Sequence, residues 1–512
     1  MSVEERLPRT LLLSGLISLV LYAGYDHWGE LPVALGFARE RPSAALNTAI
    51  LWAALWLAWL PAALWVARTP PAAGAEDRRA LLWVLLLGIL FRVVLIPGLP
   101  DLSSDFYRYL WDGRVFHAGV NPYAFPPVAA ALEPLRLDDL HTHLNRPYAL
   151  GYYPPLSQWV FRAVAALRPD VVGLKLAFIT FEAAGIAALL LLLRGAGRPL
   201  SQSLVYLWNP LIVIELARGG HSDALMLPFL LLAIHFRRKD RMTLAGIALG
   251  LAALARLYPI VLLASLTRRT RPGERGFLGF EPRLPIACIL TVVFGYLPFA
   301  GIPGGPFGHA PAYIGSDWEE FNAGIRIALR HVLAWVVSEE DPWFYAVLSG
   351  RILIACFLAL CVRVLVTREE EDAALGRAIA ILGGWLLLAT PSLEPWYAWG
   401  LVALSAVTLS PGWIWFSGAV GLSYLKFVVA ESLVPTWVLY VEFLPTLGLL
   451  AWEAGRWQPA TRPLPGPALE GSGRPLPSRA SRRALLPLYI IGVFPLIAIV
   501  ITLFFLLAGF TR

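Results

Sequence analysis

Four charged residues of one short stretch, Asp101, Asp105, Arg108 and Asp112, follow one another at spacings of four, three and four residues. Residues at these spacings share one face of a helix. A serine directly before Asp105 is a suitable N-cap, and the helix dipole stabilises a carboxylate in the first turn. Such a carboxylate can take the proton of a nearby hydroxyl as a general base. The alternative is structural: Asp105 supports the helix N-terminus and Arg108 pairs with Asp112.

The residues around this stretch supply further groups that could contact a ligand. Tyr107 lies within it, Asn121 follows in a proline-rich turn, and Tyr153 opens an amphipathic helix. His141 and His143 stand only two residues apart, which is a poor helical spacing for a shared metal ion, and no third ligand is evident. We expect these two histidines to be solvated loop residues.

A second group of polar and aromatic residues borders apolar runs farther along the chain: Arg218, His221, Asp223, Arg256, Tyr258, Glu394, Trp396 and Tyr397. Polar residues at membrane depth usually face an interior cavity and tend to be functional. Arg256 has two interpretations, because it directly precedes a Leu-Tyr-Pro sequence that interrupts an apolar run. Its guanidinium could bind a substrate anion or the free carbonyl groups of a broken helix.

The elements that must position these residues are membrane helices. The chain has 512 residues, of which 58% are hydrophobic and 15% charged, whereas soluble domains are about 25% charged. A helix needs roughly 20 apolar residues to cross a bilayer. We therefore expect an all-α, polytopic transmembrane bundle with about thirteen spans, near residues 11–25, 46–67, 80–98, 172–193, 200–217, 222–236, 284–300, 344–366, 376–391, 397–410, 412–430, 434–452 and 485–509.

The break at Arg256 decides the predicted topology. It divides the run 242–266, which we interpret as two half-helices that return to the side they left. With this hairpin and a cytoplasmic N-terminus, the arginine-rich loops fall in the cytoplasm, as the positive-inside rule requires. The same rule makes residues 153–167 a surface or re-entrant helix. The net charge of +7 lies in these loops, so we expect no nucleic-acid partner.

This topology divides the chain into parts: residues 1–98 with three spans, 99–171 as a large outer loop with amphipathic helices and Asp105, 172–452 as the remaining membrane core with a second outer loop at 302–343, 453–484 as a cytoplasmic linker, and 485–512 as a C-terminal span. Arginine greatly outnumbers lysine, which is typical of a G+C-rich bacterial genome. We expect a bacterial inner membrane protein whose site faces away from the cytoplasm.

The chain resembles the GT-C superfamily of membrane glycosyltransferases, and within it the polyprenol-phosphate-mannose-dependent mannosyltransferases of glycosyltransferase family 87. The stretches that carry this resemblance are SSDFYRYLWDGRVFHAGVNPYAFPP (103–127), YYPPLSQ (152–158), WNPLIVIELARGGHSDALMLPFLLLA (208–233), AGIALGLAALARLYPIVLLASL (245–266) and PSLEPWYAW (391–399). Where the family usually has a lysine before the half-helix proline, this chain has Arg256. That residue keeps the positive charge with a different geometry.

The resemblance implies a GT-C fold and transfer of a hexose, expected to be mannose, from a polyprenyl-phosphate donor to a lipid or glycan acceptor. Transfer would occur outside the cytoplasm with inversion at the anomeric carbon, and Asp105 would be the base. Arg256, Arg218 or Arg108 would then face the anionic leaving group. Some GT-C enzymes use a divalent ion, which Asp101 and Asp105 could hold. The polyprenyl-phosphate-mannose users imply no cofactor and no metal, and that is our expectation.

Two other function classes remain open from the sequence. A polytopic transporter or lipid flippase would also have many spans, a broken helix and a charged residue within the membrane. No inverted repeat is evident, however, and the polar residues gather on one side. A membrane acyltransferase would need a clear His–Asp motif, for which His221-Ser222-Asp223 is a weak candidate.

Overall fold

The chain is helical throughout the part that the structure describes. The computed structural model describes residues 9–28, 44–68, 75–269, 276–302, 305–314, 321–337, 341–367, 374–427 and 434–456. Within these ranges there is no β-strand, only isolated bridges around Phe280. The all-α class is confirmed. The span expected at 485–509 and most of the 453–484 linker lie outside the described residues.

The helices follow one another in two halves. The first half comprises α1 (Arg9–Ala23), α3 (Ala44–Arg68), α4 (Ala75–Leu95), α5 (Asp105–His117), η2 (Ala130–Leu135), η3 (Asp139–His143), α6 (Pro155–Leu167), α7 (Val171–Gly195), η4 (Leu200–Ser203), α8 (Leu204–Leu207), α9 (Pro210–Val213), η5 (Ile214–Arg218), η6 (Ser222–Met226) and α10 (Leu227–Arg238). The second half comprises α11 (Met242–Ala255), η7 (Tyr258–Leu262), α12 (Leu263–Leu266), α13 (Arg283–Tyr296), η8 (Leu297–Phe299), α14 (Ala310–Ile314), α15 (Gly324–Val336), α16 (Pro342–Val366), α17 (Ala374–Gly384), η9 (Trp385–Ala389), η10 (Pro395–Ala398), α18 (Trp399–Thr408), α19 (Pro411–Ala419), η11 (Val420–Phe427) and α20 (Thr436–Arg456).

Three of the described helices are long and apolar enough to cross a membrane by themselves: α3, α7 and α16. Two of them begin at an aspartate whose carboxylate accepts a backbone N–H of the first turn, Asp170 for α7 and Asp341 for α16, as N-caps do. The expected number of about thirteen spans is not confirmed, since most of the other helices are shorter. The ten residues of α18, for example, extend about 15 Å.

The span expected at 200–217 is not one straight helix. The chain breaks after α8 and resumes at α9 with a bend of 62°. Asn209 lies at the break and its side chain accepts the N–H of Leu211 over 3.1 Å, while Pro210 lacks a backbone donor and starts the next helix. This Asn-Pro sequence starts a new helix. The sequence analysis missed the start because the residues on both sides of it form one apolar run.

The hairpin expected around Arg256 is present. Helix α11 ends at Ala255, Arg256 has an extended backbone with φ −141° and ψ 132°, and η7 and α12 follow. The chain then returns to the start of the hairpin, because Nε of Arg237 at the end of α10 donates to the carbonyl of Leu266 at the end of α12 over 2.6 Å. The two half-helices therefore begin and end close together, as expected for a hairpin.

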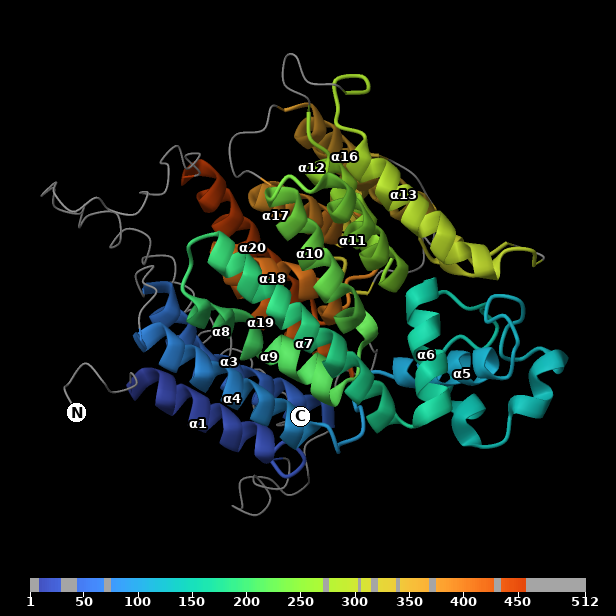
Figure 1. The fold of residues 1–512 in the computed structure, drawn as a ribbon, viewed down its shortest axis with the longest axis horizontal. Coiled ribbons are helices and arrows are strands. Elements are labelled where there is room, and N and C mark those ends of the chain that lie inside the picture. The colour runs from blue at the N-terminus through green and yellow to red at the C-terminus, as the bar shows by residue number, and fades with distance from the viewer. Residues whose placement is uncertain are drawn as a thin grey trace, which may run out of the picture.

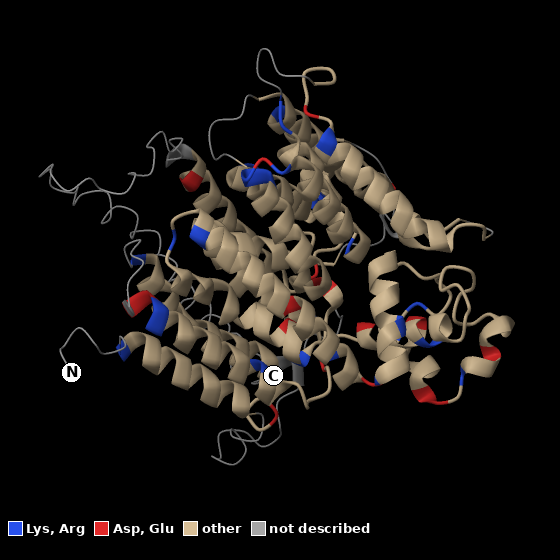
Figure 2. Ribbon diagram, in the orientation of Figure 1, with Lys and Arg blue, Asp and Glu red and all other residues tan. Residues whose placement is uncertain are grey.

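Helices α5 and α6 form a lobe beside the main bundle (Figure 1). They cross closely at Gly113, where a Cβ atom would lie 2.4 Å from the carbonyl oxygen of Phe161. With 13 residues, α6 is too short to span a membrane, which agrees with the surface helix expected at 153–167. Charged residues are sparse along the helices of the bundle (Figure 2).

The segment 302–343, predicted to be a second outer loop, contains a helix that the sequence analysis did not anticipate. Helix α15 has 13 residues and an amphipathic pattern. Arg326 is buried on one side of it, whereas Val332 and Trp335 are exposed. Its thirteen residues are too few to span a membrane. The sequence analysis searched for apolar runs long enough to span, so it missed this shorter helix with two distinct faces.

Candidate active site

Asp105 is half-buried at the first position of α5. Its Oδ1 accepts a hydrogen bond of 2.8 Å from the amide of Asn145, and the hydroxyl of Tyr153 donates to its Oδ2 over 3.4 Å. Both donors are neutral, so they orient the carboxylate without neutralising its charge. A carboxylate held in this way is suited to accept a proton from a bound hydroxyl.

The start of α5 differs in detail from the sequence prediction. Ser104 occupies the N-cap position but its side chain makes no capping hydrogen bond. The hydroxyl of Ser103 instead accepts the N–H of Asp105 over 3.2 Å. Because α5 begins at Asp105, Asp101 lies before the helix and does not share its face.

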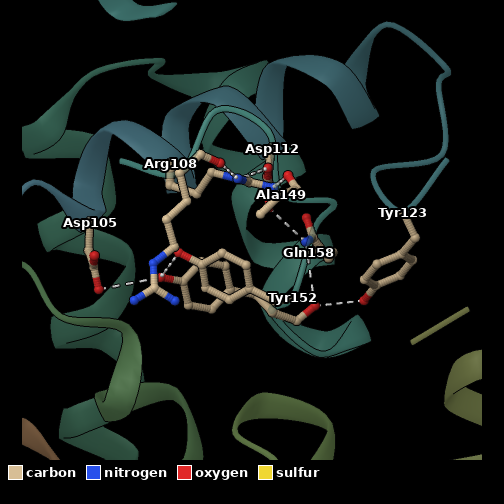
Figure 3. A network of polar contacts seen from close by, with 9 residues as sticks. Asp105, Arg108, Asp112, Tyr123, Ala149, Tyr152 and Gln158 are labelled. Carbon is tan, nitrogen blue, oxygen red and sulfur yellow. Dashed lines mark hydrogen bonds and ion pairs between the residues drawn. The ribbon is translucent and has the colours of Figure 1, made fainter. Parts of the chain in front are cut away.

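Arg108 and Asp112 form a buried ion pair, which is the structural alternative left open by their spacing. Arg108 Nε lies 2.8 Å from Asp112 Oδ1, and their side chains are 1% and 3% exposed. Arg108 also donates to the carbonyl of Ala149, and Gln158 of α6 donates to Asp112 over 3.0 Å. Figure 3 shows this network, which fixes α5, α6 and the loop between them beside Asp105.

Tyr107 and Asn121, which were predicted to contact a ligand, make contacts with other residues of the protein. The ring of Tyr107 stacks on His143 with centroids 5.0 Å apart. Asn121 accepts the N–H of Tyr123 and donates to the carbonyl of Phe299 over 3.2 Å. The Tyr123 hydroxyl in turn donates to the carbonyl of Tyr153 over 2.6 Å. These contacts hold the loop that places Tyr153 against Asp105.

Arg256 reaches the same place from the broken helix. Its guanidinium forms an ion pair with the carboxylate of Asp223 and lies 5.3 Å from the ring centroid of Tyr153. Within the described part of the chain, Arg256 Nε and Asp223 Oδ1 are buried without a hydrogen-bond partner. Because buried polar groups are normally satisfied, the described residues leave part of the hydrogen-bonding capacity of the Arg256–Asp223 pair unused.

His221 lies in a buried polar network that the sequence analysis only partly identified. Its Nδ1 is 2.9 Å from Glu215 Oε2, and the hydroxyl of Tyr424 donates to the other carboxylate oxygen over 2.6 Å. The imidazole stacks on Trp396 with centroids 3.8 Å apart and an interplanar angle of 16°. The structure thus brings His221 and Trp396 into contact and adds Glu215 and Tyr424 to their surroundings.

Burial and nearby charges shift the pKa of Glu394. Burial raises its pKa to about 7; the charges of Asp105 and Glu215 add to this effect, and those of Lys426 and His221 oppose it. Its carboxylate is half-buried. A carboxyl group with this pKa changes its charge near neutral pH.

Tyr258 and Tyr397 form an aromatic wall beside Glu394. Tyr258 stacks on Trp385 with centroids 4.2 Å apart and rings nearly parallel at 8°. Tyr397 lies 5.8 Å from Trp385. Tyr258 is the first residue of η7, two positions after Arg256.

Arg218 and Asp101 pair with each other. Arg218 pairs with Asp101 at 3.3 Å and with Asp26 at 2.7 Å, so two carboxylates already neutralise it. Burial raises the pKa of Asp101, and Arg218 opposes this shift. Asp101 and Asp105 therefore contact different partners, and no group of three or more potential metal-ligating side chains occurs among the described residues.

Comparison with known proteins assigns the chain to a family. Residues 11–268, half of the chain, match the family model described as alpha-(1->6)-mannopyranosyltransferase, N-terminal domain. The chain belongs to this family. Residues 152–391 also match glycosyltransferase family 87, so the resemblance found in the sequence is confirmed. The protein is thus a membrane protein of a glycosyltransferase family, consistent with its apolar helices.

Relatives in this mannosyltransferase family are distant. Alpha-(1->6)-mannopyranosyltransferase A of Corynebacterium glutamicum is 25% identical over 238 residues, 44% of this chain and 47% of the relative. Its namesake in Mycobacterium tuberculosis is 24% identical over 458 residues, 80% and 84% of the two chains. The chain thus spans about half the length of the first relative and most of the second. No solved structure gives a significant match.

The mannosyltransferase family model includes most of the predicted site, from Asp105 to Tyr258, but not the segment around Glu394. Sequence reasoning missed Asn145, Glu215 and Tyr424. Glu215 had a usable signal, because it is an acidic residue inside an apolar run. Asn145 had none, since it lies in a polar loop whose position depends on the tertiary fold.

Proposed function

We propose that the protein is an integral membrane mannosyltransferase. It transfers mannose from a polyprenyl-phosphate donor to a hydroxyl of a lipid or glycan acceptor, with inversion. The geometry around Asp105 supports this proposal best: an oriented, half-buried carboxylate next to Tyr153, whose ring lies under the guanidinium of Arg256. A proton acceptor at the hydroxyl and a cation over the ring thus both contact one tyrosine.

Each residue has a part in the proposed reaction. The acceptor hydroxyl attacks the anomeric carbon and gives its proton to Asp105. The bond from that carbon to the phosphate oxygen breaks, and the polyprenyl phosphate leaves as an anion. Arg256 stabilises this anion electrostatically, as cations do for departing phosphates. Asp223 positions the guanidinium, and the wall of Tyr258 and Tyr397 excludes water from the sugar.

The proposed orientation places the 99–171 loop outside the cytoplasm of a bacterial inner membrane. About thirteen spans would cross it in a GT-C arrangement, with the last span at 485–509. The positive-inside distribution of arginine supports this orientation. The return of the 242–266 hairpin to Arg237 supports it too, because it keeps the later loops on the side that this rule assigns to them.

A transfer assay tests the proposal. The full chain, reconstituted in lipid vesicles, receives polyprenyl-phosphate mannose that carries radiolabel in the sugar, together with membrane glycolipid acceptors. We expect labelled glycolipid and release of polyprenyl phosphate. Movement of intact labelled donor across the vesicle, without any new glycosidic product, would instead identify a flippase and refute the proposal.

A further inference from the structure

The two carboxylate oxygens of Asp105 are held by two different segments of the chain. Asn145, in the loop before α6, donates to Oδ1 over 2.8 Å, and Tyr153, two residues before α6, donates to Oδ2 over 3.4 Å. These donors lie 40 and 48 positions after Asp105 in the chain. The orientation of the Asp105 carboxylate therefore depends on how these two segments are fixed.

Arg108 fixes the first of these segments. Its guanidinium donates to the carbonyl of Ala149 over 3.1 Å and to that of Arg146 over 3.4 Å. Arg146 directly follows Asn145 and has φ 51°, a left-handed conformation that is uncommon for a residue with a side chain. Such a backbone persists only where the surrounding structure holds it. The contacts from Arg108 thus hold the turn from which the Asn145 amide reaches Asp105.

Asp112 fixes the second segment. Its Oδ2 accepts a hydrogen bond of 3.0 Å from Gln158, a buried residue of α6 (Figure 3). The same amide nitrogen of Gln158 donates to the carbonyl of Tyr153 over 3.4 Å. Gln158 therefore links Asp112 to the residue whose hydroxyl reaches the second oxygen of Asp105.

The ion pair that joins the two segments is shielded from solvent. Arg108 Nε and Asp112 Oδ1 are 2.8 Å apart, and the two side chains are 1% and 3% exposed. Neither residue takes part in the proposed reaction. A general base must lie within hydrogen-bond reach of the proton that it takes, and a misplacement of about 1 Å can lower a rate about a hundredfold. A buried pair that holds both neighbours of the base can therefore control the rate without touching the substrate.

We propose that Arg108 and Asp112 are positioning residues for the Asp105 carboxylate. Arg108 acts through the loop before α6, and Asp112 acts through the start of α6. Their ion pair couples the two paths, so that the loop and the helix together hold the two oxygens of one carboxylate. The effect on the reaction rests on the proposed function, because it takes Asp105 to be the base.

A double-mutant cycle tests whether Arg108 acts through Asn145. Arg108→Lys keeps the charge opposite Asp112, but a single ammonium group cannot also reach both carbonyl groups. We expect Arg108→Lys and Asn145→Ala each to lower kcat of mannose transfer about tenfold or more, with the donor KM within about twofold of the parent value. The double variant should lose little more than either single variant, because residues that act along one path are not additive. Full additivity, or a loss confined to KM, would overturn the inference.

Hydrogen–deuterium exchange tests the positioning without an activity readout. In the full chain in lipid nanodiscs, Arg108→Lys should speed exchange of the backbone amides of residues 144–149 at least about fivefold, and Gln158→Met should do so for residues 151–158. Gln158→Met leaves the ion pair in place and carries the test if Arg108→Lys does not fold. Asp138→Asn is the matched control, since it removes an ion pair with Arg114 that joins α5 to the same loop at another place. It should leave the exchange of both segments unchanged.

The two measurements distinguish a failure of this inference from a failure of the proposed function. Mannose transfer by the parent, together with parent-like exchange in Arg108→Lys and Gln158→Met, would overturn the inference and leave the proposed function intact. A parent protein that transfers no mannose, but whose two segments exchange faster in these variants, would support the positioning of Asp105 and refute only the proposed function.

Discussion

At the scale of single residues, the structure shows which partners the charged groups of the predicted site have. Arg108 and Arg218 are both engaged by carboxylates, Arg108 by Asp112 and Arg218 by Asp101 and Asp26. Arg256 also has a carboxylate partner, Asp223, and Arg256 and Arg218 each keep a buried Nε without a hydrogen-bond partner among the described residues. Asp105 contacts only neutral groups in its two side-chain hydrogen bonds.

Asp105→Asn should leave a folded, membrane-inserted protein with at most about a hundredth of the parent transfer rate, because general-base catalysis contributes roughly 10²–10⁴-fold. The amide keeps the size of the side chain but cannot accept the proton. The transfer assay described above measures the rate. Asp138→Asn is the control, an aspartate of the same loop whose side chain is 52% exposed. Near-parent activity of Asp105→Asn would refute its role as base.

Arg256→Ala should impair use of the donor more than Arg256→Lys, because the leaving phosphate requires positive charge first and guanidinium geometry second. We expect the alanine variant to lose about tenfold or more in kcat/KM for the donor. Steady-state kinetics with varied donor concentration measures this. If both variants equal the parent, Arg256 only supports the helix break through Asp223.

Glu394 should give the protein a pH-dependent stability. Its pKa is raised by burial to about 7, above its ordinary value, so between roughly pH 5 and pH 7 the folded state binds more protons than the unfolded state. Stability from this group is therefore present at low pH and lost as pH rises through that window. Glu394→Gln should flatten the melting temperature across that range, measured by scanning fluorimetry. An unchanged slope would show that neighbouring groups, His221, Asp105 or Lys426, cause it.

At the scale of elements, local sequence signals decide where helices start, break and reverse. The Arg256-Leu-Tyr-Pro sequence ends α11 because proline lacks a donor and disfavours helix in the residue before it. The reversal is then completed by tertiary contacts, the Arg237–Leu266 hydrogen bond and the approach of Arg268 to Asp240 at 4.0 Å.

The reversal predicts that both ends of the hairpin lie on one side of the membrane. In a background without native cysteines, Asp240→Cys and Arg268→Cys should both resist a membrane-impermeant maleimide in intact cells and react after permeabilisation. Leu137→Cys, in the 99–171 loop and 80% exposed in the parent, should react in intact cells. Labelling of positions 240 and 268 from opposite sides would contradict the hairpin.

At the scale of the whole molecule, buried polar networks join helices that are far apart in sequence. Arg92 of α4 and Glu182 of α7 form a two-pronged ion pair with distances of 2.6 and 2.5 Å. Tyr206 donates to the same carboxylate over 3.1 Å, and Trp399 of α18 donates to Tyr206 over 2.7 Å. Because an unpaired buried charge is very costly, this network specifies how the helices pack around the active site.

We expect the protein to work without a divalent metal ion, as its resemblance to the polyprenyl-phosphate-mannose users implies. Asp101 pairs with Arg218, whereas Asp105 accepts hydrogen bonds from Asn145 and Tyr153. Dialysis against EDTA should therefore leave the transfer rate of the reconstituted protein within about twofold of the untreated rate. A large loss that added Mg²⁺ or Mn²⁺ restores would contradict this expectation and favour an ion at Asp101 and Asp105.

The sequence by itself determined the all-α class, the helix that starts at Asp105 and the break at Arg256. Each depends on neighbouring residues: apolar runs, an acidic first turn, and a proline that removes a backbone donor. Tertiary structure alone decided that Arg218 pairs with Asp26, 192 positions away, and that Asn145 orients Asp105. Such contacts join segments distant in the chain, and spacing along a sequence carries no record of which distant segments meet when the core packs.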